Sequence, residues 1–278
     1  MKQRRLNRVL VYFAVAVIAA VMLFPILWAV SASLRTDDEL YAYMQPTTWH
    51  TFFPVEVTAD AYVRLFEEYE FQQPILNSLL SCAMTVVLGC LVNSVAAVAF
   101  ALFDFKGKRL IFSVIVITFM IPFESIALPL YRVAMGMGLI NTIEGIYLPS
   151  IANGLVLFLF VQFFKDIPKG ILEAAVIDGA KWRQVFLRII FPISGTVFVT
   201  SALVLFISQW NAYLWPLLVA QSKELRLIQT RLGDFKTEEA TEWAAMYAAS
   251  MLSAVIPLGL FLPFQKYYIE GVTSGSIK

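Results

Sequence analysis

Long apolar stretches alternate with shorter polar ones along the 278 residues of the chain. The first apolar run begins near Val9 and extends for about 24 residues. As a helix rising ~1.5 Å per residue, it is long enough to cross a hydrocarbon layer of ~30 Å. The whole pattern predicts six membrane-spanning helices, over approximate ranges 9–33, 74–103, 110–128, 142–164, 193–220 and 243–264.

The polar stretches between these runs differ in length and character. Residues 34–72 form the longest, residues 165–192 form a basic and patterned loop, and residues 265–278 form a C-terminal tail. A cleaved signal peptide would have a shorter apolar core and a small-residue cleavage site, so the first helix is expected to be retained. We expect one transmembrane domain over residues 1–278.

Composition agrees with an all-α polytopic membrane protein. Hydrophobic residues make up 59% of the chain and charged residues 15%, against about 25% charged in soluble domains. With two cysteines and one histidine, neither a disulfide framework nor a metal site is expected. The formal net charge of +1 gives no reason to expect a nucleic-acid partner.

The distribution of charge predicts the orientation in the membrane. If the N-terminus is cytoplasmic, 14 of the 21 Lys and Arg residues lie in inner segments and 7 in outer segments. Acidic residues are distributed the other way, with 5 inside, 13 outside and two, Glu124 and Glu144, within the approximate spans. The positive-inside bias therefore places both termini and the loop at 165–192 in the cytoplasm.

The loop at 165–192 has the pattern of two short helices joined by a turn. Pro168 is suited to the first turn of a helix, and Gly179 to the left-handed residue that follows a helix end. Pro192 is expected to end the second helix, because its ring cannot continue the hydrogen-bond ladder. That helix presents one apolar face, at offsets 0, 3, 4, 7 and 8: Trp182, Val185, Phe186, Ile189 and Ile190.

Catalytic chemistry is not expected. The chain has no GxxxxGK[ST] phosphate loop, and outside the membrane it has no Ser-His-Asp or Cys-His set. We therefore expect neither a catalytic residue nor a bound cofactor. If the protein carries out uphill transport, the energy must come through a partner, and the loop at 165–192 is the candidate contact.

The spacing EAAxxDGAxxxxxF, followed by a proline, resembles the EAA loop of bacterial ABC-importer permeases, which have the type I (MetI-like) fold. The resemblance implies a coupling helix that docks in a groove of a cytoplasmic ATPase, and Mg-ATP bound by that ATPase. One departure is Thr196, near which many relatives carry a second proline. The residues that carry the motif are Glu173, Ala174, Ala175, Asp178, Gly179, Ala180, Phe186 and Pro192.

Within this loop the resemblance assigns roles to two kinds of residue. Glu173 or Asp178 would make charge-assisted hydrogen bonds to the ATPase; which of the two does so stays open, as does a role for both as ordinary helix-terminal charges. The apolar residues would allow close approach of the ATPase groove: Ala174, Ala175, Ile177 and Ala180.

Further pieces are similar to the carbohydrate-uptake, MalG-like branch of these permeases. They are Pro129-Leu-Tyr131, Gly138-Leu-Ile-Asn141-Thr142, Gly145, Trp210-Asn211, Leu214-Trp-Pro216 and the tail from Gly271 to Lys278.

This branch implies a MalF-like second permease, a dimer of ATPase subunits, an extracytoplasmic solute-binding protein and a sugar cargo. It also implies a multi-pass location in the bacterial cytoplasmic (inner) membrane. Three tail residues would reach the ATPase: Gly271, Ser274 and Gly275.

Several polar residues inside the apolar runs are candidates for a translocation path. Planar amides and aromatic faces commonly hold sugars, but the same residue types also mark membrane interfaces and join helices, so both interpretations stay open. Glu124, counted about 14 residues into the third helix, is expected to face the protein interior or a wet cavity. The candidates are Glu124, Asn93, Asn153, Gln209, Trp210 and Asn211.

Two alternatives to a sugar importer stay open. The cargo of an ABC importer permease could be another polar solute such as glycerol phosphate, although no basic residue lies within the spans to hold a phosphate. A secondary transporter or channel would work without an ATPase.

Overall fold

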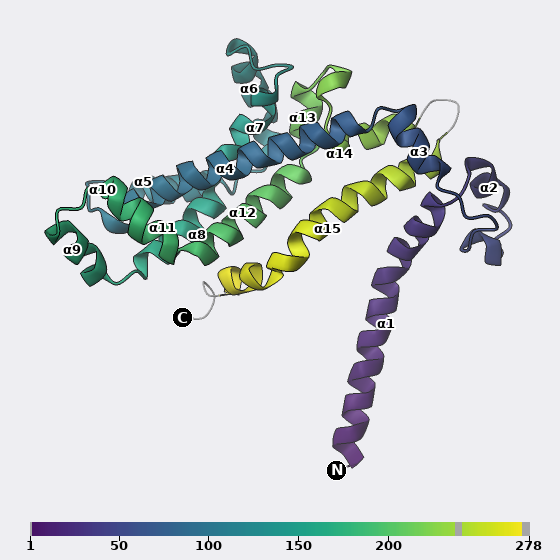
Figure 1. Cartoon of the computed structure of the whole chain (residues 1–278), viewed down its shortest axis with the longest axis horizontal. Coiled ribbons are helices and arrows are strands. Elements are labelled where there is room, and N and C mark those ends of the chain that lie inside the picture. The colour runs from purple at the N-terminus through teal and green to yellow at the C-terminus, as the bar shows by residue number, and fades with distance from the viewer. Residues whose placement is uncertain (1, 237–240, 274–278) are drawn as a thin grey trace. The chain divides into compact units, whose positions relative to one another are not determined.

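The computed structural model describes residues 2–236 and 241–273, in which helices carry the fold (Figure 1). These residues fall into two units. Unit 1 comprises Met1–Gln72 with Arg231–Ile256, and unit 2 comprises Gln73–Thr230 with Pro257–Lys278. Unit 2 holds every predicted site residue outside the tail, and it is the larger of the two.

Three helical segments are individually long and apolar enough to cross a membrane: Asn7–Ser33, Gln72–Leu102 and Trp243–Lys266. Up to three more spans arise if each bent pair of helices counts as one. The pairs are Lys108–Thr118 with Phe123–Gly136 (100°), Ile143–Ile151 with Gly154–Lys165 (42°), and Trp182–Ile193 with Gly195–Trp210 (82°). The helices thus provide three spans, or up to six, the number that hydropathy predicts.

Unit 1 is built around two arginines that join its polar segments. Its elements are α1 (Lys2–Ser33), α2 (Asp37–Ala42), η1 (Trp49–Thr51), α3 (Asp60–Glu67), η4 (Leu232–Phe235) and the first part of α15 (Trp243–Thr273). Among the described residues no strand occurs, and an isolated bridge pairs Lys236 with Thr241.

Arg35, which follows α1, is buried and donates a hydrogen bond to the carbonyl oxygen of His50 (2.8 Å). Its Nε lies 3.5 Å from the carboxylate of Glu39, which accepts the backbone N–H of Val55 (2.8 Å). Burial lowers the pKa of Arg35, and Glu39 opposes this shift. Because a buried charge is tolerated only when it is paired, this network holds residues 34–56 in one conformation.

Arg64 of α3 forms the second hub. Its guanidinium lies 3.1 Å from Glu68, 3.1 Å from Glu242 and 3.7 Å from Asp37. Partial burial lowers the pKa of Arg64, but the hydrogen bond to Glu68 and the charges of the three carboxylates outweigh it and raise the pKa overall. Arg64 thereby joins α2 and α3 to the start of α15.

Unit 2 is arranged along α4 (Gln72–Leu102), which runs unbroken while most of its neighbours are interrupted (Figure 1). The other elements of unit 2 are α5 (Lys108–Thr118), α6 (Phe123–Gly136), α7 (Ile143–Ile151), α8 (Gly154–Lys165), α9 (Lys169–Ile177), α10 (Trp182–Val185), the π-helical turn η2 (Phe186–Ile190), α11 (Phe191–Ile193), α12 (Gly195–Trp210), α13 (Leu214–Val219), η3 (Lys223–Leu225) and α14 (Ile228–Arg231), whose last residue opens the second segment of unit 1.

Two hydrophobic cores lie among the described residues of unit 2. The first, here the loop core, contains buried residues of α4, α8, the segment from Ile167 to Ile190, and α12: Ala97, Val156, Leu157, Phe160, Val161, Phe164, Ile167, Leu172, Ala175, Val185, Ile190, Val197 and Leu205. The second, here the Trp215 core, lies among α6, α7, α13 and the segment after α13: Ala134, Ile146, Trp215, Val219, Ala220 and Leu227.

The Trp215 core brings together residues that carry the resemblance to the carbohydrate-uptake branch. The indole N–H of Trp215 donates to the carbonyl oxygen of Gly145 (2.9 Å), and the Gly145 N–H donates to the Thr142 hydroxyl oxygen (3.0 Å). Asn141 has a φ of +60°, and its backbone N–H donates to Val219 (2.7 Å). These motif residues are therefore neighbours that shape one end of unit 2.

The structure corrects the prediction that the third, fourth and fifth helices are continuous. The helix expected over 110–128 is interrupted between Thr118 and Phe123, where Pro122 disfavours a helical conformation at the residue before it. The helix expected over 142–164 breaks at Ala152, which is extended (ψ 102°). The helix expected over 193–220 begins at Gly195 and is interrupted after Trp210.

Pro192 was expected to end the second helix of the loop, and the helix ends one residue later, at Ile193, where a bend of 82° follows. The preceding turn is widened to a π-helix, in which the Phe191 N–H donates to the carbonyl oxygen of Phe186. The widened turn relieves the clash between the proline ring and the preceding turn, so Pro192 fits within the last turn of this helix.

Close packing at Gly145 gives a stability test. A β-carbon at Gly145 would lie 2.0 Å from the carbonyl oxygen of Leu139, whereas one at Gly195 would meet nothing within 4 Å. We expect Gly145→Ala to destabilise the protein by about 1–3 kcal/mol, the usual cost of overpacking. Gly195→Ala serves as the control and should leave the melting temperature of the detergent-solubilised protein unchanged or slightly higher. Equal melting temperatures for the two variants would contradict the packing described.

Candidate functional site: the helical hairpin at residues 165–192

The patterned loop forms a helical hairpin at one end of unit 2, with α9 and α10 as its arms (Figure 1). The chain leaves α8 at Lys165, and Ile167 enters the loop core before Pro168 caps the start of α9. Asp178 ends α9, and α10 begins at Trp182. The hairpin therefore follows α8 directly and shares its core.

The EAA-type sequence encodes a well-defined helix end. The Gly179 N–H donates to the carbonyl oxygen of Val176 (3.0 Å), and the Ala180 N–H to that of Ala175 (3.0 Å). These two bonds form the Schellman arrangement, which requires a left-handed residue after the helix; Gly179 has a φ of +78°. The prediction of a left-handed conformation at Gly179 is confirmed.

One face of α9 packs inward and the other is exposed. Leu172 and Ala175 are 7% and 9% exposed and belong to the loop core, against which Ala180 also packs. Ile177, by contrast, is 84% exposed, and Ala174 lies on the exposed side as well. Ala175 and Ala180, expected to admit the ATPase groove, are thus turned toward the chain's own core, because the Schellman turn brings them together.

The second arm is held by its apolar face. Val185 and Ile190 are fully buried, and Phe186 and Ile189 pack against the loop core. Trp182 is 43% exposed and packs on Phe103, just after the end of α4, with ring centroids 4.5 Å apart. Phe186 therefore supports the hairpin from within.

The exposed side of the hairpin carries unpaired charge. Within the described part of the chain, neither Glu173 nor Asp178 has a basic group within ion-pair distance. Both side chains are exposed. Two carboxylates and the apolar Ile177 are thus presented outward on a helix whose opposite face is fixed to the loop core.

Two candidates for the translocation path, Asn93 and Asn153, instead satisfy the backbone at the break between α7 and α8. The side-chain amide of Asn93 donates to the carbonyl oxygens of Gly89 (2.7 Å) and Ile151 (2.7 Å). Its Oδ1 accepts the Asn153 N–H (3.2 Å), and the Asn153 side chain caps α8 by accepting the Val156 N–H (3.1 Å). Their geometry favours the structural interpretation.

Gln209 and Trp210 are also buried within unit 2. The Gln209 amide donates to the Ser81 hydroxyl (2.7 Å), joining α12 to α4, while its Oε1 has no hydrogen-bond partner among the described residues. Trp210 stacks on Phe206 with centroids 5.6 Å apart. Asn211 is exposed, and its amide donates to the Ile207 carbonyl (2.9 Å) at the end of α12.

Glu124 lies in the first turn of α6, after the break, and is exposed on this chain. The depth counted along one continuous helix is therefore wrong. In the tail, Gly271 belongs to the helical backbone of α15, whereas Ser274 and Gly275 lie outside the described residues. The structure does not bring the six path candidates together in one place.

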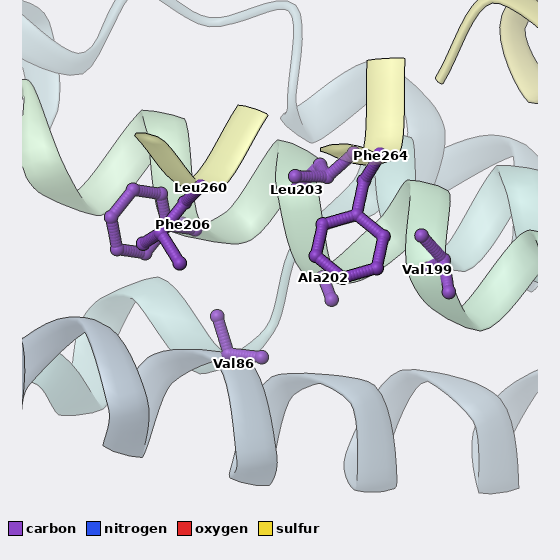
Figure 2. A pocket seen from close by; sticks show the side chains of 7 residues that line it. All are labelled: Val86, Val199, Ala202, Leu203, Phe206, Leu260 and Phe264. Atoms are coloured by element: carbon purple, nitrogen blue, oxygen red, sulfur yellow. The ribbon is translucent and has the colours of Figure 1, made fainter. Parts of the chain in front are cut away.

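An apolar groove of about 240 Å³ opens on unit 2 (Figure 2). Polar cargo would find no hydrogen-bonding side chain among the residues that line the groove, so it is not a candidate for a sugar path. Its lining comes from α4, α12 and the end of α15: Val86, Val199, Ala202, Leu203, Phe206, Leu260 and Phe264.

Sequence reasoning missed two residues that hold the hairpin. Leu172 joins α9 to the loop core, and Phe103 receives the ring of Trp182. The signal for Leu172 was available, because it precedes Ala175 by three residues and so shares its helical face. No sequence pattern near Phe103 indicated its role, because its contact with Trp182 joins segments that are far apart in the sequence.

Apolar helices long enough to span a membrane, other helices that are interrupted, and an exposed hairpin define a helical membrane protein. The chain belongs to the family described as binding-protein-dependent transport system inner membrane component, which matches residues 85–271. Proteins of this family are permease subunits of transporters, and a transport role rather than catalysis follows from membership.

Similar proteins cover nearly the whole chain. The arabinooligosaccharides transport system permease protein AraQ of Halalkalibacterium halodurans is 32% identical, over 95% of this chain and 94% of its own length. The lactose transport system permease protein LacG of Rhizobium radiobacter is 28% identical, over 99% and 98%. The trehalose/maltose transport system permease protein MalG of Thermococcus litoralis is 27% identical, over 100% and 99%.

Solved structures share the fold. A chain of a bacterial ABC transporter involved in the import of the acidic polysaccharide alginate aligns with a TM-score of 0.83 and 21% identity, over 96% of this chain and 98% of that one. A chain of a bacterial alginate ABC transporter in complex with its alginate pentasaccharide-bound periplasmic protein aligns with a TM-score of 0.66 and 16% identity, over 94% of each chain. The fold is thus that of an ABC importer permease.

Two substitutions at Gly179 can separate the effect of side-chain charge from the effect of side-chain shape. A side chain at this left-handed φ is strained, but Asn and Asp bear that strain about equally and meet nothing within 4 Å. We expect Gly179→Asp, which adds a third carboxylate beside Asp178, to uncouple ATP hydrolysis from uptake while the protein stays inserted. Gly179→Asn, of the same shape, should keep most of the uptake. Full uptake by the Asp variant at normal membrane levels would contradict a coupling role for the hairpin.

Proposed function

We propose that this chain is one of two unlike permease subunits of an ATP-driven importer, and that the importer carries a sugar or sugar derivative. Family membership supports the permease role. The printed names of similar proteins support the cargo class, since they cite arabinooligosaccharides, lactose, and trehalose or maltose. The buried polar residues of unit 2 are amides and hydroxyls rather than cations, which suits an uncharged polar cargo better than a phosphate.

The observation that carries the coupling role is the two-sided geometry of α9. Leu172 and Ala175 are buried in the loop core, while Glu173 and Asp178 are exposed without ion-pair partners among the described residues. We assign the exposed residues Glu173, Ala174 and Asp178 to the contact with a cytoplasmic ATPase. Ala175, Gly179, Ala180, Phe186 and Pro192 then set the shape of the hairpin, and Mg-ATP is bound by the ATPase.

The proposed topology has six spans in the bacterial cytoplasmic membrane, with both termini and the hairpin in the cytoplasm. The excess of Lys and Arg in the segments assigned inside supports it. The outer segments hold most of the acidic residues, and an extracytoplasmic binding protein is proposed to dock there. The tail residues Gly271, Ser274 and Gly275 are proposed to lie near the ATPase.

Transport would follow alternating access between two states. ATP binding closes the ATPase dimer and moves the hairpins of the two permeases together, and the cargo path opens toward the binding protein. Glu124 is proposed to face this path, because an exposed carboxylate in an apolar segment requires a wet cavity or a protein partner. The second permease would complete the cavity on that side.

A reconstitution experiment tests the proposed function. The tagged chain is purified with the subunits that accompany it, placed in proteoliposomes containing Mg-ATP, and supplied with its binding protein and labelled maltose, trehalose, lactose, arabinotriose or glycerol phosphate. We expect uptake of at least one sugar that requires both ATP and the binding protein. ATP-independent uptake would indicate a secondary transporter, and uptake of glycerol phosphate but of no sugar would contradict the proposed cargo.

A further inference from the structure

Asn93 joins the continuous helix α4 to the break between α7 and α8. Its amide donates to the carbonyl oxygen of Ile151, the last residue of α7 (2.7 Å), and its Oδ1 accepts the N–H of Asn153, which precedes α8 (3.2 Å). The side chain is 4% exposed. One amide therefore takes up two backbone groups that no helical ladder can satisfy there.

The break also separates the two cores of unit 2. From Val156 onward, buried residues of α8 belong to the loop core, together with the hairpin. Ile146 of α7, before the break, belongs to the Trp215 core. The hairpin and α8 are thus one packed half, α7 and the Trp215 core are the other, and Asn93 contacts the chain where the halves meet.

Close contacts surround the same point. A β-carbon at Gly154, the first residue of α8, would lie 1.9 Å from the ring of Phe119, which ends α5 at its own break. A β-carbon at Gly89 on α4 would lie 2.8 Å from Leu205 of α12. Two helix breaks therefore meet beside Asn93, where the backbones and rings are too close to admit a larger residue.

Bending at a helix break that a side chain bridges costs less free energy than bending a continuous helix. Bending a helix ruptures backbone hydrogen bonds, which are costly to lose in an apolar setting. At Ala152 the ladder is already interrupted, and the two chain ends there are joined to α4 by the amide of Asn93. Relative motion of the two halves is therefore least costly at this point.

We propose that Asn93 is a positioning residue of the transport cycle: it holds the pivot about which the half containing α8 and the hairpin turns against the half containing the Trp215 core. The proposal rests on the function proposed above. Motion imposed on the hairpin passes into α8 because Leu172 and Ile167 share the loop core with Phe164. Without Asn93 the two halves still fold, but the angle between them is no longer set.

Asn77 offers a matched control on the same helix. It is 6% exposed, and its amide donates to two backbone carbonyls, those of Glu224 (2.7 Å) and Arg226 (3.1 Å). Asn77 thus equals Asn93 in type, burial and number of carbonyl partners, but it lies far along α4 from the break. A purely structural role would make the two asparagines equivalent.

The test measures ATP hydrolysis and sugar uptake by the reconstituted importer. We expect Asn93→Leu to lower the sugar taken up per ATP hydrolysed by roughly tenfold, since two buried hydrogen bonds are lost at the pivot. Asn77→Leu should keep the wild-type ratio, and the milder Asn93→Ser should give an intermediate ratio. Equal ratios for Asn93→Leu and Asn77→Leu, or loss of assembly in both Asn93 variants, would overturn the proposal.

A distance measurement reports on the pivot itself. Spin labels are placed at Glu144, exposed on α7, and Lys165, exposed at the end of α8, after Cys82 and Cys90 are replaced by alanine. We expect the distance to change between the ATP-free and vanadate-trapped importer, and Asn93→Leu to abolish the change or broaden it. A constant distance in a wild-type importer that transports sugar would overturn the pivot, whereas absence of any ATP-dependent uptake would contradict the proposed function instead.

Discussion

Satisfying the backbone inside an apolar environment is the constraint on which unit 2 depends. Each helix interruption frees N–H and C=O groups that cost several kcal/mol if they are left unpaired in hydrocarbon. The chain meets this requirement with polar side chains from neighbouring elements: Asn93 at the α7–α8 break, Trp215 on the Gly145 carbonyl, and Asn77 on the segment after α13. Three of the residues considered for a cargo path, Asn93, Asn153 and Gln209, instead form hydrogen bonds that join or cap the helices of unit 2.

In the hairpin, too, a helix end is satisfied by specific hydrogen bonds, here at an exposed surface. Its Schellman turn brings Ala175 and Ala180 to the loop core, and that packing orients the outer residues of α9. If the hairpin docks on an ATPase as proposed, its inner face must be part of a packed body in order to transmit motion. Ala175 and Ala180 thus attach the hairpin to the loop core, and Glu173, Ala174 and Asp178 remain on the exposed side.

Hydropathy predicted where most apolar helices lie, and the DGA sequence predicted the left-handed Gly179. The interruptions were missed because a run of apolar residues looks alike whether the helix continues or bends, although Pro122 was a visible signal in one case. The burial of Ala175 and the pairing of Trp182 with Phe103 depend on contacts between distant segments, which composition and periodicity do not contain. The depth predicted for Glu124 was wrong because the interruption before α6 was missed.

We propose that the hairpin receives the energy for transport from an ATPase. Site-specific photo-cross-linking in native membranes tests it most directly, with the photoreactive residue at Ile177, the most outward apolar position of α9, and at Leu128 of α6 as an exposed control in the other half of unit 2. We expect a cross-link from Ile177, but not from Leu128, to a protein whose peptides contain a GxxxxGK[ST] phosphate loop. Cross-links from Ile177 to lipid alone, or to a protein without that loop, would contradict it.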